Sequence, residues 1–192
     1  MTDVQIVLYD GFDELDAVGP YEVFASAAAL GAEIDVSLVT LDERGRVEAS
    51  HGLRVEPDGV LADPDLLVVP GGGWNDRSAE GAWTQVERGD LPEAIARLHA
   101  DGTTLASVCT GGMILASAGV LDGRPAVTHA GALADLRETA AEVRAERVVD
   151  DGDVVTAGGV TSGLDLALHL VERLADAGIA DRVATELEYE RR

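Results

Sequence analysis

Cys109 is the only cysteine in the 192-residue chain, and it lies where a strand pattern changes to a helix pattern. Residues 105–108 read as the end of a buried strand, whereas the residues from Met113 onward favour a helix. The thiol is therefore predicted on the turn, where the free N–H groups and the dipole of a helix N-terminus favour an anion. A cysteine so placed would have a depressed pKa and act as a nucleophile. The alternative is a small buried hydrophobic residue.

Pairs of glycines mark this turn and a second turn at residues 71–72. Gly111 and Gly112 let the new helix start at a sharp angle and leave room for a ligand or another backbone segment. The arrangement is a sulfur version of the strand-to-helix nucleophile elbow of serine hydrolases. Gly71 and Gly72 offer backbone N–H groups that could form an oxyanion hole with the amide of Thr110, or they form a tight turn that needs positive φ. The Thr110 hydroxyl would orient water or substrate, or only cap the helix.

Asp16 is the candidate acid. As a structural residue it would be the N-cap or a first-turn carboxylate of a helix, worth about 1 kcal/mol. As a functional residue it would be directed at the Cys109 sulfur, and burial and a neighbouring thiolate would raise its pKa until it donates protons near neutral pH. A helix terminus contributes only about 0.3–1 kcal/mol, less than one pKa unit. A hydrogen-bonding acid is therefore expected to lower the thiol pKa further.

Among the four histidines, His129 follows a short strand and is the one expected near the site. His51 lies in a turn, and His99 and His169 lie in predicted helices with a solvent-facing alternative. No metal-ligand spacing is present. The Pro-Gly-Gly-Gly stretch at 70–73 lacks the ending of a phosphate-binding loop, and the chain has no lysine.

Strand patterns that alternate with helix patterns must position these residues. This alternation predicts an α/β fold with a mostly parallel sheet and helices on both faces. Ligands of such sheets gather at the carboxyl ends of the strands, where the glycine-marked ends at 71–73, 109–112 and 158–159 and also Asp16 are expected. Strands are expected at 4–9, 34–41, 66–69, 105–108 and 126–128, a ribbon at 46–55, a hairpin of 148–149 with 154–156, a polar loop from 74 to 90, and helices at 20–30, 91–100, 111–118, 132–144, 162–174 and 179–187.

The charge balance is extreme, with 36 acidic residues, 14 basic residues that are all arginine, and a formal charge of −22. Such a surface would repel nucleic acids and anionic lipid. Molar salt shortens the screening length to about 3 Å and would remove most of the self-repulsion. A halophilic cytoplasm is therefore the expected habitat.

Length and composition favour a single domain over residues 1–192. No apolar run approaches the roughly 18 residues of a membrane span, and the amino terminus lacks the features of a signal peptide. A single cysteine excludes an intramolecular disulfide, so the reducing cytoplasm is the simplest location.

Several motifs occur together along nearly the whole chain: Leu-Asp at 15–16 with Gly-Pro-Tyr-Glu-Val-Phe at 19–24, Val-Pro-Gly-Gly at 69–72, Ser-Val-Cys-Thr-Gly at 107–111, Leu-Asp-Gly-Arg at 121–124 with Thr-His at 128–129, and Thr-Ala-Gly-Gly-Val-Thr-Ser-Gly-Leu-Asp-Leu-Ala-Leu at 156–168. In these motifs the sequence resembles the ThiJ/PfpI (DJ-1) superfamily. Within it, the likeness is greatest to the isonitrile hydratase branch and to the amidase-like domain of some transcription regulators.

The resemblance implies a flavodoxin-like three-layer sandwich, a homodimer, and a small-molecule substrate. It implies Cys109 as nucleophile, Asp16 as its acidic partner and Thr110 as a neighbouring polar group. Cys109 would attack the terminal carbon of an isonitrile, and water would then release an N-substituted formamide, with no metal or organic cofactor.

Two departures from other branches narrow the expectation. Protease-like and amidotransferase-like relatives use a histidine after the nucleophile or a distant one, whereas this chain has Thr110 there, which argues against peptidase activity. Glyoxalase and deglycase relatives use a glutamate where this chain has Asp16. A glyoxalase-type or deglycase-type enzyme acting on reactive carbonyls is one alternative. A non-catalytic protein whose Cys109 senses oxidants is the other.

Overall fold

A seven-stranded sheet runs through the structure, a computed structural model that describes residues 1–192. Every neighbouring pair is parallel except the two strands at one edge, which form the expected antiparallel hairpin. The order across the sheet is β10 (Val148–Asp150), β11 (Val154–Ala157), β7 (Thr104–Ser107), β6 (Leu66–Val69), β1 (Thr2–Leu8), β2 (Ile34–Thr40) and β5 (Gly59–Val60).

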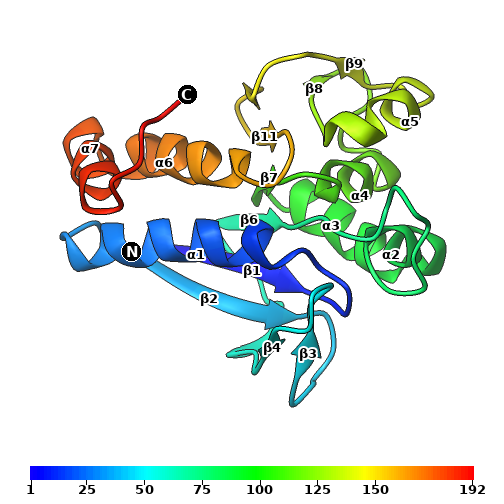
Figure 1. The fold of residues 1–192 in the computed structure, drawn as a ribbon, viewed down its shortest axis with the longest axis horizontal. Coiled ribbons are helices and arrows are strands. Elements are labelled where there is room, and N and C mark those ends of the chain that lie inside the picture. Colours follow the sequence, from blue (N-terminus) through cyan, green and yellow to red (C-terminus); the bar gives the residue numbers. More distant parts are fainter.

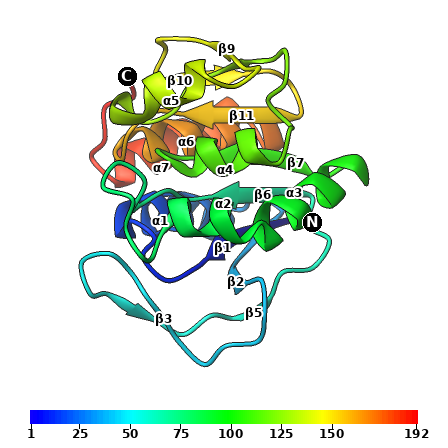
Figure 2. The same ribbon diagram turned by 90° about the vertical axis from the view of Figure 1, so that its right-hand side faces the viewer.

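Helices cover both faces of this sheet (Figures 1 and 2). One layer holds α1 (Glu14–Ala29), α6 (Ser162–Leu174) and α7 (Ala177–Glu186), which pack against each other. The other holds α2 (Ala82–Arg88), α3 (Asp90–Ala100) and α4 (Gly111–Ser117). The predicted three-layer, flavodoxin-like α/β fold is confirmed. No helix combines the length and the apolar character that crossing a membrane requires.

Smaller elements lie outside the main sheet. The predicted ribbon is an antiparallel pair, β3 (Val47–Glu48) and β4 (Arg54–Val55). A second pair, β8 (Pro125–Ala126) and β9 (Glu142–Val143), is parallel, and between its strands lie η1 (Ala130–Ala132) and α5 (Leu133–Arg137).

Two predictions in the amino-terminal half of the chain were wrong: the start of the first helix and the polar loop at 74–90. The first helix begins at Glu14, not Pro20, because the Asp13 side chain caps it by accepting from the N–H of Leu15 at 3.3 Å. Pro20 therefore lies inside α1. The predicted polar loop before Asp90 contains α2, which has no side-chain cap and so lacks the usual start signal.

The predicted helix at 132–144 was also wrong, because α5 ends at Arg137. The Thr139 hydroxyl donates to the carbonyl of Leu136 at 2.7 Å and accepts from the N–H of Ala141 at 3.2 Å. Such local side-chain bonds compete with helix formation. The chain therefore turns into β9, and the expected strand at 126–128 is reduced to Pro125–Ala126.

The carboxyl ends of the central strands meet at one edge, as predicted. Their residues are buried: β6 and β11 are buried throughout, and β7 is buried in all but its first residue. Backbone hydrogen bonds join the segments that follow these strands: the N–H of Val108 donates to Val69 at 3.0 Å, and the N–H of Cys109 donates to Gly158 at 2.9 Å. This edge positions the candidate site.

Candidate active site

Cys109 lies on the turn between β7 and α4, with a left-handed φ of 57°. A non-glycine residue in this region is strained by about 1–3 kcal/mol and persists only where its surroundings fix it. Here the N–H of Cys109 donates to Gly158, and its carbonyl accepts from the Thr128 hydroxyl at 2.8 Å. The predicted elbow is therefore present, and the residue is 5% exposed.

Gly111 is required by the close approach of α4 to the sheet. A Cβ on this residue would overlap the carbonyl oxygen of Val69 at the end of β6. Its own N–H donates back to Val108 at 2.9 Å. The glycine thus lets the helix start directly against the strand end.

Asp16 lies in the first turn of α1 and is completely buried. Its Oδ2 accepts from the N–H of Gly71 at 3.0 Å, while Oδ1 has no partner of regular hydrogen-bond geometry. The carboxyl is close enough to the Cys109 thiol for a hydrogen bond to affect the pKa of both groups. Burial, followed by the nearby charge of Asp13, raises the pKa of Asp16 to about 7.

The expected depression of the thiol pKa is wrong. Burial, followed by the charge of Asp16, raises the pKa of Cys109 to about 12. The helix that follows has only seven residues, and its first N–H groups bond back to Val108, Cys109 and Thr110. They are therefore unavailable to the sulfur, and the thiol keeps its proton at neutral pH.

Two backbone N–H groups do face the sulfur. Those of Val160 and Thr110 lie near enough to Cys109 to act to lower its pKa, although burial outweighs them. Val160 has a positive φ of 33°, unusual for a β-branched residue. Val160 directly follows the predicted strand end at Gly158-Gly159. Sequence reasoning did not identify it as a site residue, because a valine side chain gives no sign that its backbone N–H lies near the sulfur.

The N–H groups of Gly71 and Gly72 are occupied. Gly71 donates to Asp16, and Gly72 donates to Oγ1 of Thr110 at 2.9 Å. The predicted oxyanion hole is therefore not formed by these groups, because both have internal acceptors. The Thr110 hydroxyl does not cap α4 either. It fixes the glycine turn beside the cysteine, and a Cβ on Gly71 would collide with Thr110.

His129 is half-buried beside the site. Its backbone N–H donates to the carbonyl of Cys109 at 3.3 Å, and its ring packs against Gly159. Nδ1 accepts from the N–H of Gly131 at 3.0 Å and lies 3.3 Å from the Asn75 side-chain amide. The imidazole is thus held by the backbone and makes no hydrogen bond to the thiol.

Tyr9 is a site residue that sequence reasoning missed. It is buried at the end of β1, and its hydroxyl donates to the carbonyl of Pro70 at 2.5 Å. Burial, and then the charges of Asp16 and Cys109, raise its pKa well above the usual value. The phenol therefore stays protonated and holds the turn on which Gly71 lies. Its position at a strand end was the available signal.

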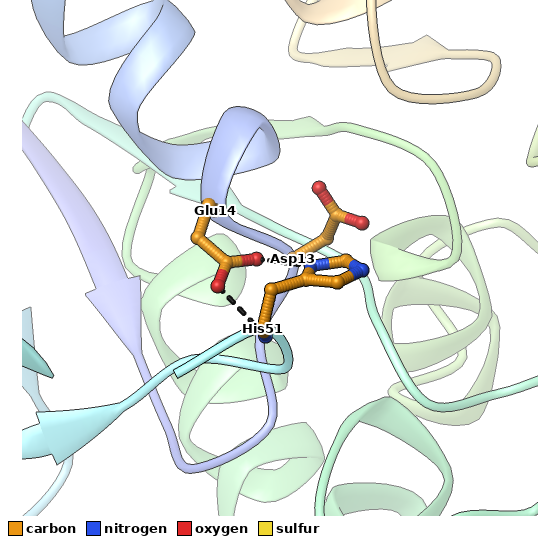
Figure 3. A group of neighbouring side chains, drawn as sticks. All are labelled: Asp13, Glu14 and His51. Carbon is orange, nitrogen blue, oxygen red and sulfur yellow. Dashed lines mark hydrogen bonds and ion pairs between the residues drawn. The ribbon is translucent and has the colours of Figure 1, made fainter. Parts of the chain in front are cut away.

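Asp13, Glu14 and His51 bring ligand atoms within 4.8 Å of one another (Figure 3). Glu14, however, already accepts from the His51 ring at 2.7 Å, the His51 N–H at 2.7 Å and the Ser50 hydroxyl at 3.3 Å. These bonds attach the 50–53 turn to the start of α1. The group is explained as a structural anchor.

An open cavity of about 620 Å³ reaches the Gly72 turn. Neither Cys109 nor Asp16 lines it. Its wall is strongly acidic, which makes this side of the site unfavourable for anions. The carboxylates are those of Asp10, Asp13, Glu48, Asp76 and Glu80.

The two tryptophans line a cavity to which Cys109 does not contribute. Trp74 and Trp83 form an edge-to-face pair with centroids 5.1 Å apart, and the Arg77 guanidinium lies 3.9 Å from the Trp83 ring centroid. Trp74 also donates from Nε1 to Asp135 at 2.6 Å. With Met113 these rings line a separate cavity of about 340 Å³.

The chain belongs to the DJ-1/PfpI family, whose model matches residues 2–173. The isonitrile hydratase of Pseudomonas putida is 34% identical to it over 190 residues, which cover 97% of this chain and 78% of that protein. A deglycase of Thermococcus kodakarensis is 33% identical over 159 residues, 80% of this chain and 87% of that enzyme. A ThiJ/PfpI family protein from Pseudomonas syringae has a TM-score of 0.87 and 27% identity, covering 98% of this chain and 75% of its own.

Proposed function

We propose that the protein is a cofactor-independent cysteine hydratase that converts a small, uncharged isonitrile into an N-substituted formamide. The observation that carries the proposal is the buried Cys109–Asp16 pair, in which Asp16 has a pKa of about 7. Similarity to the isonitrile hydratase supports it. A general acid or base works best when its pKa is near the operating pH.

The raised thiol pKa assigns Asp16 two successive roles. As Sγ of Cys109 bonds to the terminal carbon of R–N≡C, the S–H bond breaks and the Asp16 carboxylate takes the proton. Asp16 then gives this proton to the same carbon, which forms the thioimidate R–N=CH–S–Cys. The N–H groups of Val160 and Thr110 stabilise negative charge on sulfur while it is deprotonated.

Water completes the cycle. It adds to the thioimidate carbon as Asp16 takes one proton from it, and Asp16 passes this proton to the nitrogen. In the resulting adduct R–NH–CH(OH)–S–Cys the C–S bond breaks, Asp16 moves the hydroxyl proton to the sulfur, and R–NH–CHO leaves. Isonitriles carry no net charge, which suits a buried thiol beside an acidic cavity.

Turnover of cyclohexyl isonitrile in molar salt tests the proposal. We expect wild-type protein to consume it, and Cys109→Ala and Asp16→Asn to lose at least about a hundredfold in rate. Asp101→Asn, which changes an exposed carboxylate after α3, is the matched control and should keep full activity. Turnover that survives Cys109→Ala, or none by the wild type, would contradict the assignment.

A deglycase or glyoxalase activity on reactive carbonyls is the second candidate, because the Thermococcus deglycase is 33% identical over 80% of this chain. Conversion of methylglyoxal without glutathione, faster than isonitrile turnover, would favour it. An oxidant sensor is disfavoured, because a protonated, buried thiol oxidises slowly.

We also propose a homodimer located in the cytoplasm. Leu15 and Val18 on α1 are 37% and 39% exposed, and Leu53, whose N–H lies against Glu14, is 42% exposed. We propose that a second copy covers these exposed apolar side chains. Light scattering on purified protein in molar salt should give twice the chain mass, and Val18→Asp should give a monomer. A wild-type monomer would contradict the dimer.

A further inference from the structure

Val160 lies in a turn that is hydrogen-bonded to Cys109, and it has an unusual backbone conformation there. Its φ of 33° lies in the left-handed region, which β-branched side chains disfavour. It lies in the short turn between β11 and α6, where Gly158 also accepts from the N–H of Cys109 at 2.9 Å. Something outside the turn must keep it in place.

Arg147 holds this turn from both sides of Val160. Its backbone carbonyl accepts from the N–H of Gly158 at 3.0 Å, and its Nη2 donates to Oγ1 of Thr161 at 2.9 Å. Gly158 and Thr161, which lie on either side of Val160 in the chain, are thus both bound to Arg147.

Arg147 is itself fixed by a buried acid. Its Nε donates to Oδ2 of Asp165, which is 5% exposed in the first turn of α6. The Tyr189 hydroxyl donates to the same oxygen at 2.9 Å, and Nη2 of Arg147 lies 3.3 Å from that hydroxyl. A charge-assisted network of this kind is stronger than a single exposed ion pair.

We propose that Arg147, held by Asp165 and Tyr189, is a positioning residue for Cys109: it keeps the turn of residues 158–161 bound to the Cys109 backbone and the Val160 N–H near the sulfur. It touches no reacting atom and acts through the turn. The inference rests on the proposed role of Cys109 as the nucleophile. The titratable groups that face Cys109 directly are Asp16 from α1 and Tyr9 from the end of β1.

Alkylation by iodoacetamide tests the proposal, because the chain has one thiol and all the signal comes from Cys109. We expect Arg147→Met to raise the thiol pKa and to slow alkylation at neutral pH about tenfold, the effect of losing one hydrogen bond to a charged group. Arg147→Lys should restore part of the rate, and the milder Tyr189→Phe should slow it less.

Arg173→Met is the matched control. Arg173 also joins α6 to β10, through Asp150 at 3.1 Å, but it does not contact the turn. Its alkylation profile should match the wild type. Variants that stay folded by circular dichroism and alkylate like the wild type across the pH range would overturn the proposal.

The readout does not depend on isonitrile turnover. A changed alkylation profile in a protein that consumes no isonitrile would reject the hydratase and keep the positioning role. An active hydratase whose Arg147→Met variant alkylates like the wild type would keep the hydratase proposal and reject the positioning role of Arg147.

Discussion

Gly71 donates its backbone N–H to Oδ2 of Asp16 at 3.0 Å, and this bond joins the end of β6 to the first turn of α1 directly beside the thiol. It occupies one carboxyl oxygen and leaves Oδ1 for the sulfur or a substrate. The bond stabilises the charged form of the acid, while burial and Asp13 favour the protonated form. The balance places the pKa of Asp16 near neutral pH.

This balance makes protein stability depend on pH. The pKa of Asp16 rises from 3.8 to about 7 on folding, so the native state holds the proton more tightly. The destabilisation is absent near pH 4 and complete above about pH 7, where it is on the order of 4 kcal/mol. Asp16→Asn, whose amide oxygen can still accept from Gly71, should therefore unfold at higher denaturant concentration than the wild type at pH 8, with little difference at pH 4.

Asp165→Asn is the contrasting variant for that measurement. It also removes a buried carboxylate, but one that is paired with Arg147, so it should lower stability. An Asp16→Asn variant less stable than the wild type at pH 8 would contradict the conclusion that the ionised Asp16 carboxylate destabilises the folded protein.

Asp13→Asn should lower the pKa of Asp16 below about 7, because Asp13 contributes a like charge beside it. Asparagine caps a helix as well as aspartate does, so α1 should remain intact. NMR titration of the Asp16 carboxyl measures the change. Glu14→Gln is the control, since Glu14 is bound to the 50–53 turn and should leave the Asp16 midpoint unchanged. An unmoved midpoint in Asp13→Asn would contradict the prediction.

Gly111→Ala should destabilise the protein by about 1–3 kcal/mol or more, because the new Cβ would overlap the Val69 carbonyl. It should also slow Cys109 alkylation as the elbow shifts. Gly45→Ala, where a Cβ meets open space, should change neither. Urea unfolding of both variants gives the comparison, and equal stabilities would show that α4 can move away from β6 without cost.

Salt should stabilise the protein strongly. With a formal charge of −22, repulsion acts over about 10 Å in 0.1 M salt and about 3 Å in 1 M salt. The melting temperature should rise steeply between these concentrations of potassium chloride. Equal ionic strength from sodium chloride should act almost equally if screening is the cause. A melting temperature independent of salt would reject the proposed halophilic habitat.

The positions of Cys109 and Asp16 were predictable because both follow strand ends, and parallel strands bring their carboxyl ends to one edge. The thiol pKa was not, because it depends on how completely the surrounding helices and turns exclude water. Likewise Val160 and Tyr9 act through backbone placement and burial, which their residue types do not indicate. The missed helix α2 follows a glycine-rich segment and starts at Ala82, after the N-cap Gly81, which has no side chain to cap it.

The partners of Cys109 come from segments on either side of it in the chain: the backbone groups of Gly158 and Val160 lie some fifty residues later, and the Asp16 carboxyl lies more than ninety residues earlier. During synthesis the cysteine is therefore made long before β11 exists to hold its turn. A partly made chain therefore carries an ordinary, exposed thiol, and the buried thiol of raised pKa arises only once the last strand of the sheet is in place.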